Sequence, residues 1–236
     1  MRDATMSLVD PKPPIAARLA DLDALLFDLD GTVVNTIPHI LASFRHATAE
    51  VLGEALPDDE LLRHVGVPLA RQMLFFTDDQ DTADRLLAAY RTFNHATHDD
   101  MALLYDTTLE TLETLATRGL PMGIVTSKSA HMAHRALDLF ALGGFFSAIV
   151  TADDTTSHKP DPLPLYHAAG LLGVDVTRCA YVGDSPADIA AALAAGASAI
   201  GVTWGVTDRD GLAGAGADIV IDDLAELVAM LPDSRA

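Results

Sequence analysis

Cysteine is almost absent from the chain, with only Cys179 among 236 residues. One cysteine cannot form an internal disulfide, and no Cys/His group has the spacing of a zinc site. We therefore expect a reducing compartment and predict a cytoplasmic location. Long apolar runs are also missing, because the longest (189–202) is interrupted by Gly196 and Gly201. This run is shorter than the roughly 20 residues that a spanning helix needs, so no membrane partner is expected.

Positive charge is scarce. The chain has 15 Lys and Arg against 34 Asp and Glu, which gives a net charge of −19. This balance would repel a phosphate backbone and argues against nucleic acid as a partner. A small anionic substrate would likewise need a locally positive pocket, a metal ion or helix N-termini. Half of the residues are hydrophobic, which is enough for a folded core and argues against intrinsic disorder.

Short apolar runs alternate with helical patterns along most of the chain. Alternation of this kind predicts an α/β fold whose parallel sheet is covered by helices on both faces. The predicted strands are residues 24–27, 122–125, 148–150, 180–182, 198–202 and 218–221. The predicted helices are residues 109–118, 130–139, 163–172, 186–195 and 224–230.

Residues 36–104 break this alternation. They contain apolar residues at helical spacing, such as Ile40, Phe44 and Ala47, and no convincing strand. We interpret this segment as an inserted bundle of three or four helices that covers the loop after the first strand. The predicted organisation is a flexible N-terminal tail (1–20), a core of residues 21–35 and 105–236, and a cap of residues 36–104.

Two carboxylates follow the first predicted strand. In Phe27-Asp28-Leu29-Asp30-Gly31-Thr32, the two Asp residues lie two positions apart beside a Gly turn. Such a pair, with no Lys or Arg next to it, requires a cation, and Mg²⁺ would let one carboxylate remain a nucleophile. Alternatively, Asp30-Gly31 is only a turn and Asp28 only a helix cap. The pattern alone leaves both interpretations open.

A second acidic group follows the predicted strand at 180–182. Ser185 is a good N-cap, Pro186 suits the first helical position, and Asp188 is placed as in a capping box. Capping does not explain Asp184, which precedes the cap at the end of a strand. There its carboxylate could reach a metal ion shared with Asp28.

Two further strand ends carry a hydroxyl pair and a lysine. Thr126 and Ser127 lie where hydroxyls and backbone N–H groups could face a phosphate, although such residues also cap helices. Lys159, followed by Pro160, is one of few cations in the second half of the chain. An isolated lysine is usually a solvated surface residue, but a fixed cation would stabilise a transferring phosphoryl group.

The four runs read Asp-x-Asp-Gly-Thr, a strand-end Thr, Lys-Pro and Gly-Asp-x-x-x-Asp, in that order. In these motifs, and over residues 22–231, the chain resembles the haloacid dehalogenase-like hydrolase superfamily. The resemblance implies a Rossmann-like core with helices on both faces. It also identifies the insert as the small helical cap of this family.

The resemblance implies a role for each motif residue. Asp28 would be the nucleophile that forms an aspartyl-phosphate, and Asp30 would act as general acid and then general base. Thr126 and Ser127 would bind the phosphoryl oxygens. Lys159 would hold Asp28 and balance the charge of the transferring group. An Asp at position 30 is similar to the phosphotransferase branch of the family rather than to true dehalogenases.

The resemblance also implies a Mg²⁺ site. Its ligands would be the Asp28 carboxylate, the Asp30 backbone carbonyl and the Asp184 carboxylate, with Asp188 in or just behind this shell. Among the few cap arginines, we expect Arg63 to reach the substrate because it lies close to Gly66.

The subfamily is indicated by Val65-Gly66-Val67-Pro68-Leu69, Val150-Thr151-Ala152-Asp153-Asp154 and Thr203-Trp204-Gly205, which resemble phosphoglycolate phosphatases and bacterial pyrophosphatases. Two departures stand out. The chain has Asn35-Thr36 where many relatives have Asp-Ser or Asp-Thr, and Tyr105-Asp106-Thr107 where many have Tyr-Pro-Gly. Neither departure touches the catalytic set.

These patterns predict a Mg²⁺-dependent phosphohydrolase of small phosphorylated metabolites, with phosphoglycolate or pyrophosphate as the favoured substrate. A sugar phosphomutase shares the motifs and the cap type and remains an alternative. A non-catalytic binding protein that has kept the fold is a second alternative, against which the intact motif residues argue. The sequence is compatible with a monomer or a homodimer.

Overall fold

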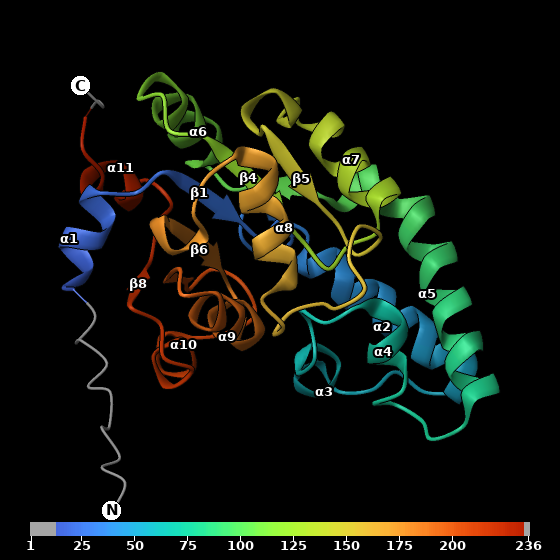
Figure 1. Cartoon of the computed structure of the whole chain (residues 1–236). Helices are drawn as coiled ribbons and strands as arrows, with labels where there is room; N and C mark the ends of the chain where they lie inside the picture. Colours follow the sequence, from blue (N-terminus) through green and yellow to red (C-terminus); the bar gives the residue numbers. More distant parts are fainter. Residues whose placement is uncertain (1–12, 234–236) are drawn as a thin grey trace, which may run out of the picture.

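The computed structural model describes residues 13–233, which contain one six-stranded sheet with helices on both faces (Figure 1). Neighbouring strands are all parallel, in the order β5-β4-β1-β6-β7-β8. The strands are β1 (Ala24–Phe27), β4 (Met122–Val125), β5 (Ala148–Val150), β6 (Cys179–Gly183), β7 (Ser198–Val202) and β8 (Ile219–Ile221). Every residue of β1, β4, β6 and β7 is buried, as expected for strands covered on both faces. The predicted fold class is confirmed.

Each face of the sheet has its own apolar cluster. One cluster packs the sheet against α1 (Ile15–Ala20), α6 (Thr108–Thr117), α7 (Ala130–Leu139) and α11 (Glu226–Met230). The other packs it against α8 (Leu163–Leu172), α9 (Pro186–Ala195) and α10 (Arg209–Gly214). Two short 3-10 helices, η1 (Gly143–Phe145) and η2 (Val176–Arg178), precede β5 and β6.

The N-terminal part of the structure differs from the expected tail. Residues 15–20, which we assigned to that tail, form α1, and Leu19 is buried in the core. Ile15, Leu19 and Leu22 are spaced as on one helix face, and all three belong to or pack against the same cluster. The rest of the predicted tail, residues 1–12, lies outside the described residues.

A second group of helices occupies the segment between β1 and α6. It contains α2 (Ile37–Leu52), α3 (Asp58–Leu62), α4 (Leu69–Met73) and α5 (Gln80–Met101), which lie together beside the sheet in Figure 1. These helices share an apolar core of their own, centred on Phe44, Leu61, Met73 and Leu86. We call residues 36–104 the cap.

A two-stranded antiparallel ribbon joins the cap to the core. Its strands are β2 (Val34–Asn35) and β3 (Leu103–Leu104), with Val34 paired with Leu104. The chain therefore leaves and re-enters the core at one place, beside the carboxyl end of β1. No helix among residues 13–233 combines the length and the apolar character needed to cross a membrane.

Candidate active site

The carboxyl ends of three adjacent strands bring the motif residues together. Connections diverge on either side of β1, which lies between β4 and β6, so its carboxyl end is the switch point where α/β sheets bind ligands. Asp28 follows β1, Thr126 follows β4, and Asp184 follows β6. Lys159 reaches the same point from the loop between β5 and α8.

Asp28 and Lys159 form a buried ion pair. Lys159 Nζ lies 2.9 Å from Asp28 Oδ1, and both side chains are almost completely buried. Burial raises the pKa of Asp28 to about 7, against the opposing effect of the Lys159 charge. Burial alone would lower the pKa of Lys159, but Asp188 and Asp28 raise it above its usual range. Lys159 therefore stays charged. A further positive charge nearby would lower the pKa of Asp28 and favour its ionised form.

Asp188 holds Lys159 from the opposite side. Its Oδ1 accepts a 2.6 Å hydrogen bond from Lys159 Nζ, and its Oδ2 accepts from the backbone N (3.0 Å) and Oγ (2.6 Å) of Ser185. Lys159 also donates to the hydroxyl of Tyr181 at 3.0 Å. The predicted capping box at Ser185 is present, and the same carboxylate orients the lysine.

Asp184 is the third buried carboxylate. Its Oδ1 accepts a long hydrogen bond from Thr32 Oγ1 (3.3 Å), and its Oδ2 accepts from the backbone N of Val206 (2.9 Å). Burial, followed by the charges of Asp188 and Asp28, raises the pKa of Asp184 well above its ordinary value. The hydrogen bonds from Thr32 and Val206 do not offset the repulsion between Asp184 and the other two carboxylates.

The donor set fits a hard divalent cation. Oxygens of Asp28, Asp184 and Asp188 lie within 4.8 Å of one another. Three carboxylates and one ammonium carry a net charge of −2 when all are ionised, which one divalent cation cancels. Asp188 already accepts hydrogen bonds from Lys159, Tyr181 and Ser185, whereas Asp28 and Asp184 retain lone pairs. Carboxylate oxygens are the ligands that Mg²⁺ prefers.

The Asp30 carboxylate is held by Lys128 and Thr36 and not by the residues of this cluster. Its Oδ1 accepts 2.6 Å hydrogen bonds from Lys128 Nζ and from Thr36 Oγ1. Although burial alone would raise its pKa, the Lys128 charge and these hydrogen bonds lower the pKa of Asp30 below its usual value. The Asp30 carboxylate is therefore not placed as a metal ligand.

Lys128 is a site residue that our reading of the sequence missed. Its ammonium is partly buried beside Asp30, and the residue lines the cavity. The available signal was its position directly after the strand-end pair Thr126 and Ser127, in a chain with few cations.

Thr126 and Ser127 differ in what their hydroxyls do. Thr126 is buried, and its Oγ1 accepts from the backbone N of Lys128 (3.2 Å). The Ser127 hydroxyl donates to the carbonyl of Gly66 in the cap (2.7 Å). Ser127 thus joins the core to the cap in this structure, in addition to lining the cavity.

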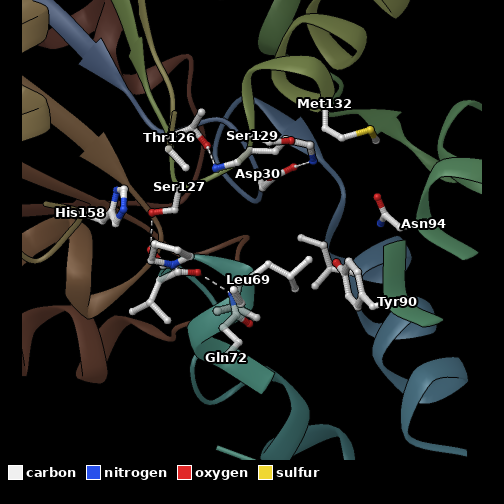
Figure 2. A pocket seen from close by; sticks show the side chains of 18 of the residues that line it. Asp30, Leu69, Gln72, Tyr90, Asn94, Thr126, Ser127, Ser129, Met132 and His158 are labelled. Carbon is white, nitrogen blue, oxygen red and sulfur yellow. Dashed lines mark hydrogen bonds and ion pairs between the residues drawn. The ribbon is translucent and has the colours of Figure 1, made fainter. Parts of the chain in front are cut away.

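A cavity of about 300 Å³ extends from these residues to the cap. Figure 2 shows Thr126, Ser127 and Asp30 on the core side, with Tyr90 and Asn94 on the opposite side. The cap residues in the wall are Ile40, Phe44, Val65, Gly66, Val67, Pro68, Leu69, Ala70, Gln72, Tyr90, Arg91, Asn94 and His95.

The structure does not bring Arg63 to this cavity. Its side chain is 62% exposed, lies 3.9 Å from Asp59 one helical turn earlier, and is not part of the cavity wall. The cap arginine in the wall is Arg91, from the middle of α5. Proximity to Gly66 in the sequence misled the prediction, because α3 ends just before Arg63 and directs it to solvent.

Comparison with known proteins agrees with this geometry. A pyrophosphatase PpaX from Bacillus pumilus is 36% identical over 210 residues, covering 89% of this chain and 96% of the relative. A pyrophosphatase PpaX from Anoxybacillus flavithermus is 34% identical over 211 residues, covering 89% and 97%. Among solved structures, one described as a predicted phosphoglycolate phosphatase from Haemophilus somnus superimposes with a TM-score of 0.82 at 25% identity, covering 89% of this chain and 98% of that one.

A second solved structure, a hydrolase from Pseudomonas syringae, superimposes with a TM-score of 0.80 at 26% identity, covering 88% and 96% of the two chains. The family model for haloacid dehalogenase-like hydrolases matches residues 25–202, which include all four motifs. The resemblance inferred from these motifs is thereby confirmed. The chain is an enzyme of the haloacid dehalogenase-like hydrolase family.

Proposed function

We propose that the protein is a Mg²⁺-dependent phosphohydrolase that acts on small phosphorylated metabolites through an aspartyl-phosphate on Asp28. The observation that carries this proposal is the buried Asp28 carboxylate, 2.9 Å from Lys159 and beside Asp184, at the core end of a closed-over cavity. The names of the relatives support pyrophosphate and phosphoglycolate as the first substrates to test.

Asp28 is the nucleophile in this mechanism. One of its carboxylate oxygens attacks phosphorus, and the bond from phosphorus to the leaving oxygen breaks. Asp188 holds Lys159 in a fixed position. Lys159 in turn keeps the Asp28 carboxylate in place and balances charge on the phosphoryl oxygens. Mg²⁺ held by Asp28 and Asp184 would supply the positive charge that favours ionised Asp28 and binds the phosphoryl group.

Asp30 is the general acid and the general base in this mechanism. It gives a proton to the leaving oxygen and takes one from the water that attacks the aspartyl-phosphate. With Lys128 2.6 Å away, Asp30 is held ionised, so the acid step requires this ion pair to loosen. An anionic substrate competes for Lys128 and would raise the pKa of Asp30 as it binds.

Mutation of the nucleophile tests the proposal. The purified protein should release phosphate from pyrophosphate, phosphoglycolate or p-nitrophenyl phosphate with Mg²⁺, and should lose this activity in EDTA. Asp28→Asn should reduce kcat to background while leaving the thermal unfolding temperature close to that of the wild type. The matched control is Asp210→Asn on the exposed surface of α10, which should retain full activity. Activity retained in Asp28→Asn, or activity without divalent cations, would contradict the proposal.

A further inference from the structure

The turn after β7 lies against Asp184, although the mechanism above assigns it no task. The turn contains Trp204, Gly205 and Val206, and the backbone N of Val206 donates to Asp184 Oδ2 at 2.9 Å. A Cβ added at Gly205 would overlap both the Cβ and the Oδ2 of Asp184. Only glycine therefore allows the backbone to approach the carboxylate this closely.

The other carboxylate oxygen of Asp184 is fixed by the loop after β1. Thr32 Oγ1 donates to Asp184 Oδ1 at 3.3 Å, and the Thr32 carbonyl accepts from the indole Nε1 of Trp204 at 3.1 Å. These two bonds and the Val206 bond form a closed ring through Thr32, Asp184 and the turn. Asp184 is thereby held on both oxygens by groups that are themselves linked.

This ring of hydrogen bonds also contacts the segment where the chain returns from the cap to the core. The hydroxyl of Tyr105, the residue directly after β3, lies 3.4 Å from the carbonyl of Trp204. The rings of Tyr105 and Trp204 meet edge to face, with centroids 6.0 Å apart. The turn is thus packed from a third side, so it is fixed independently of the Asp184 side chain.

We propose that the Trp204–Val206 turn, anchored on Thr32 by the Trp204 indole, is the positioning element that presents Asp184 to the divalent cation, with Gly205 providing the necessary space. This inference rests on the proposed function, since it assumes that Asp184 binds the cation. Hydrogen bonds that orient a metal ligand reduce the conformational freedom lost on binding, and their removal commonly weakens metal affinity tenfold to a hundredfold.

Gly205→Ala is the direct test. Gly205 does not have the left-handed backbone conformation that would strain an alanine, so the substitution acts through the overlap with Asp184. We expect it to weaken Mn²⁺ binding by about tenfold to a hundredfold, measured without substrate by electron paramagnetic resonance of free Mn²⁺. The control is Gly214→Ala in α10, where an added Cβ meets nothing within 4 Å and where Mn²⁺ affinity should not change.

A second pair of variants covers the case in which Gly205→Ala does not fold. Thr32→Val removes the hydroxyl with little change in volume and should weaken Mn²⁺ binding by about threefold to tenfold, whereas Thr32→Ser should restore it. Trp204 is the only tryptophan of the chain, so its fluorescence reports binding to every variant that retains it.

The outcomes separate this inference from the proposed function. Weakened binding in Gly205→Ala or in Thr32→Val, with normal binding in Gly214→Ala and Thr32→Ser, supports the positioning role. Wild-type affinity in every folded variant overturns the positioning role and leaves the metal site intact. If the wild-type protein binds no Mn²⁺ or Mg²⁺, the metal site itself is wrong and both proposals fall.

Discussion

At the scale of single residues, the site depends on one buried ammonium among three carboxylates. Lys159 contacts Asp28 and Asp188 directly, and its side chain is 1% exposed. Removing a partner from a buried ion pair leaves uncompensated charge, which costs about 3–5 kcal/mol. The lysine is therefore expected to matter for both stability and activity.

Lys159→Met separates these two effects. We expect kcat to fall by about a hundredfold or more, because the charge beside the nucleophile is lost. We also expect a lower free energy of unfolding, measured by urea denaturation. Lys159→Arg keeps the charge and should recover stability in part, but not kcat, because the larger guanidinium cannot occupy the same buried position. An unchanged kcat in Lys159→Met would contradict the assigned role.

The cap arginines provide a second residue-scale prediction. Arg91 lines the cavity, whereas Arg63 is directed to solvent. Arg91→Ala should raise the KM for pyrophosphate by about fivefold, an effect below that of a buried pair because solvent screens the guanidinium. Arg63→Ala should change KM by less than about twofold. The reverse pattern in steady-state kinetics would show that the sequence-based choice of Arg63 was right.

At the scale of secondary-structure elements, α2 and α5 enclose a polar cluster near the active site. His39 of α2 is fully buried and bonds to Thr97 Oγ1 (3.1 Å), and Asn94 of α5 donates to Ser43 Oγ (3.1 Å). Burial, followed by the charges of Lys128 and His98, lowers the pKa of His39 to about 4. The histidine is therefore neutral in the folded cap at neutral pH.

This histidine predicts an acid sensitivity of stability. The unfolded chain takes up a proton near the ordinary pKa of 6.5, whereas folded His39 does so only near 4. Its contribution is complete above pH 6.5 and is lost as the pH falls towards 4, by about 2 kcal/mol at pH 5. In urea denaturation at pH 7.5 and 5.0, His39→Gln should lose less stability than the wild type. His46→Gln, a half-exposed position on the same helix, should behave like the wild type.

The elements differ in how well the sequence predicts them. Buried parallel strands read as continuous apolar runs, so 24–27, 122–125 and 198–202 were predicted with their observed bounds. The β2 and β3 strands were missed because two residues cannot show a periodic pattern. The α10 helix (Arg209–Gly214) was missed because it contains two glycines and a single buried residue, Leu212.

The features of the site also differ in how well the sequence predicts them. Motif order at strand ends predicted which side chains converge, because parallel topology brings these ends together. The partner of Ser127, the Gly66 carbonyl, could not be predicted, since it depends on how the cap lies on the core. The position of Arg63 failed for the same reason.

At the scale of the whole molecule, the cap lies over the carboxylate cluster and forms one wall of the cavity. Side-chain hydrogen bonds join the cap to the core besides the ribbon. The Gly66 carbonyl accepts from Ser127 Oγ, and Arg135 of α7 donates to Asp99 Oδ1 (2.9 Å) and to the carbonyl of His95 (2.8 Å) in α5. The close approach of the Gly66 loop to the core leaves no room for a side chain there.

Gly66→Ala tests the closed arrangement. A Cβ at this position would lie 2.8 Å from Ser185 Oγ, and its φ of 108° disfavours any residue with a side chain. We expect kcat/KM to fall by about tenfold, since the cap can no longer seat against the core and exclude water. Gly53→Ala, also with positive φ but with nothing within 4 Å of the added Cβ, controls for backbone strain and should retain kcat/KM. Equal losses in both variants would assign the effect to strain alone.

In the proposed mechanism Asp28 carries the phosphoryl group, so the phosphorylated enzyme can be trapped during turnover. The enzyme is mixed with Mg²⁺ and ³²P-labelled pyrophosphate, quenched in acid during turnover, digested and mapped by mass spectrometry. We expect an acid-stable, hydroxylamine-sensitive label on the peptide that contains Asp28, and no label in Asp28→Asn. Turnover without any protein-bound label, or a label on a different residue, would contradict this mechanism.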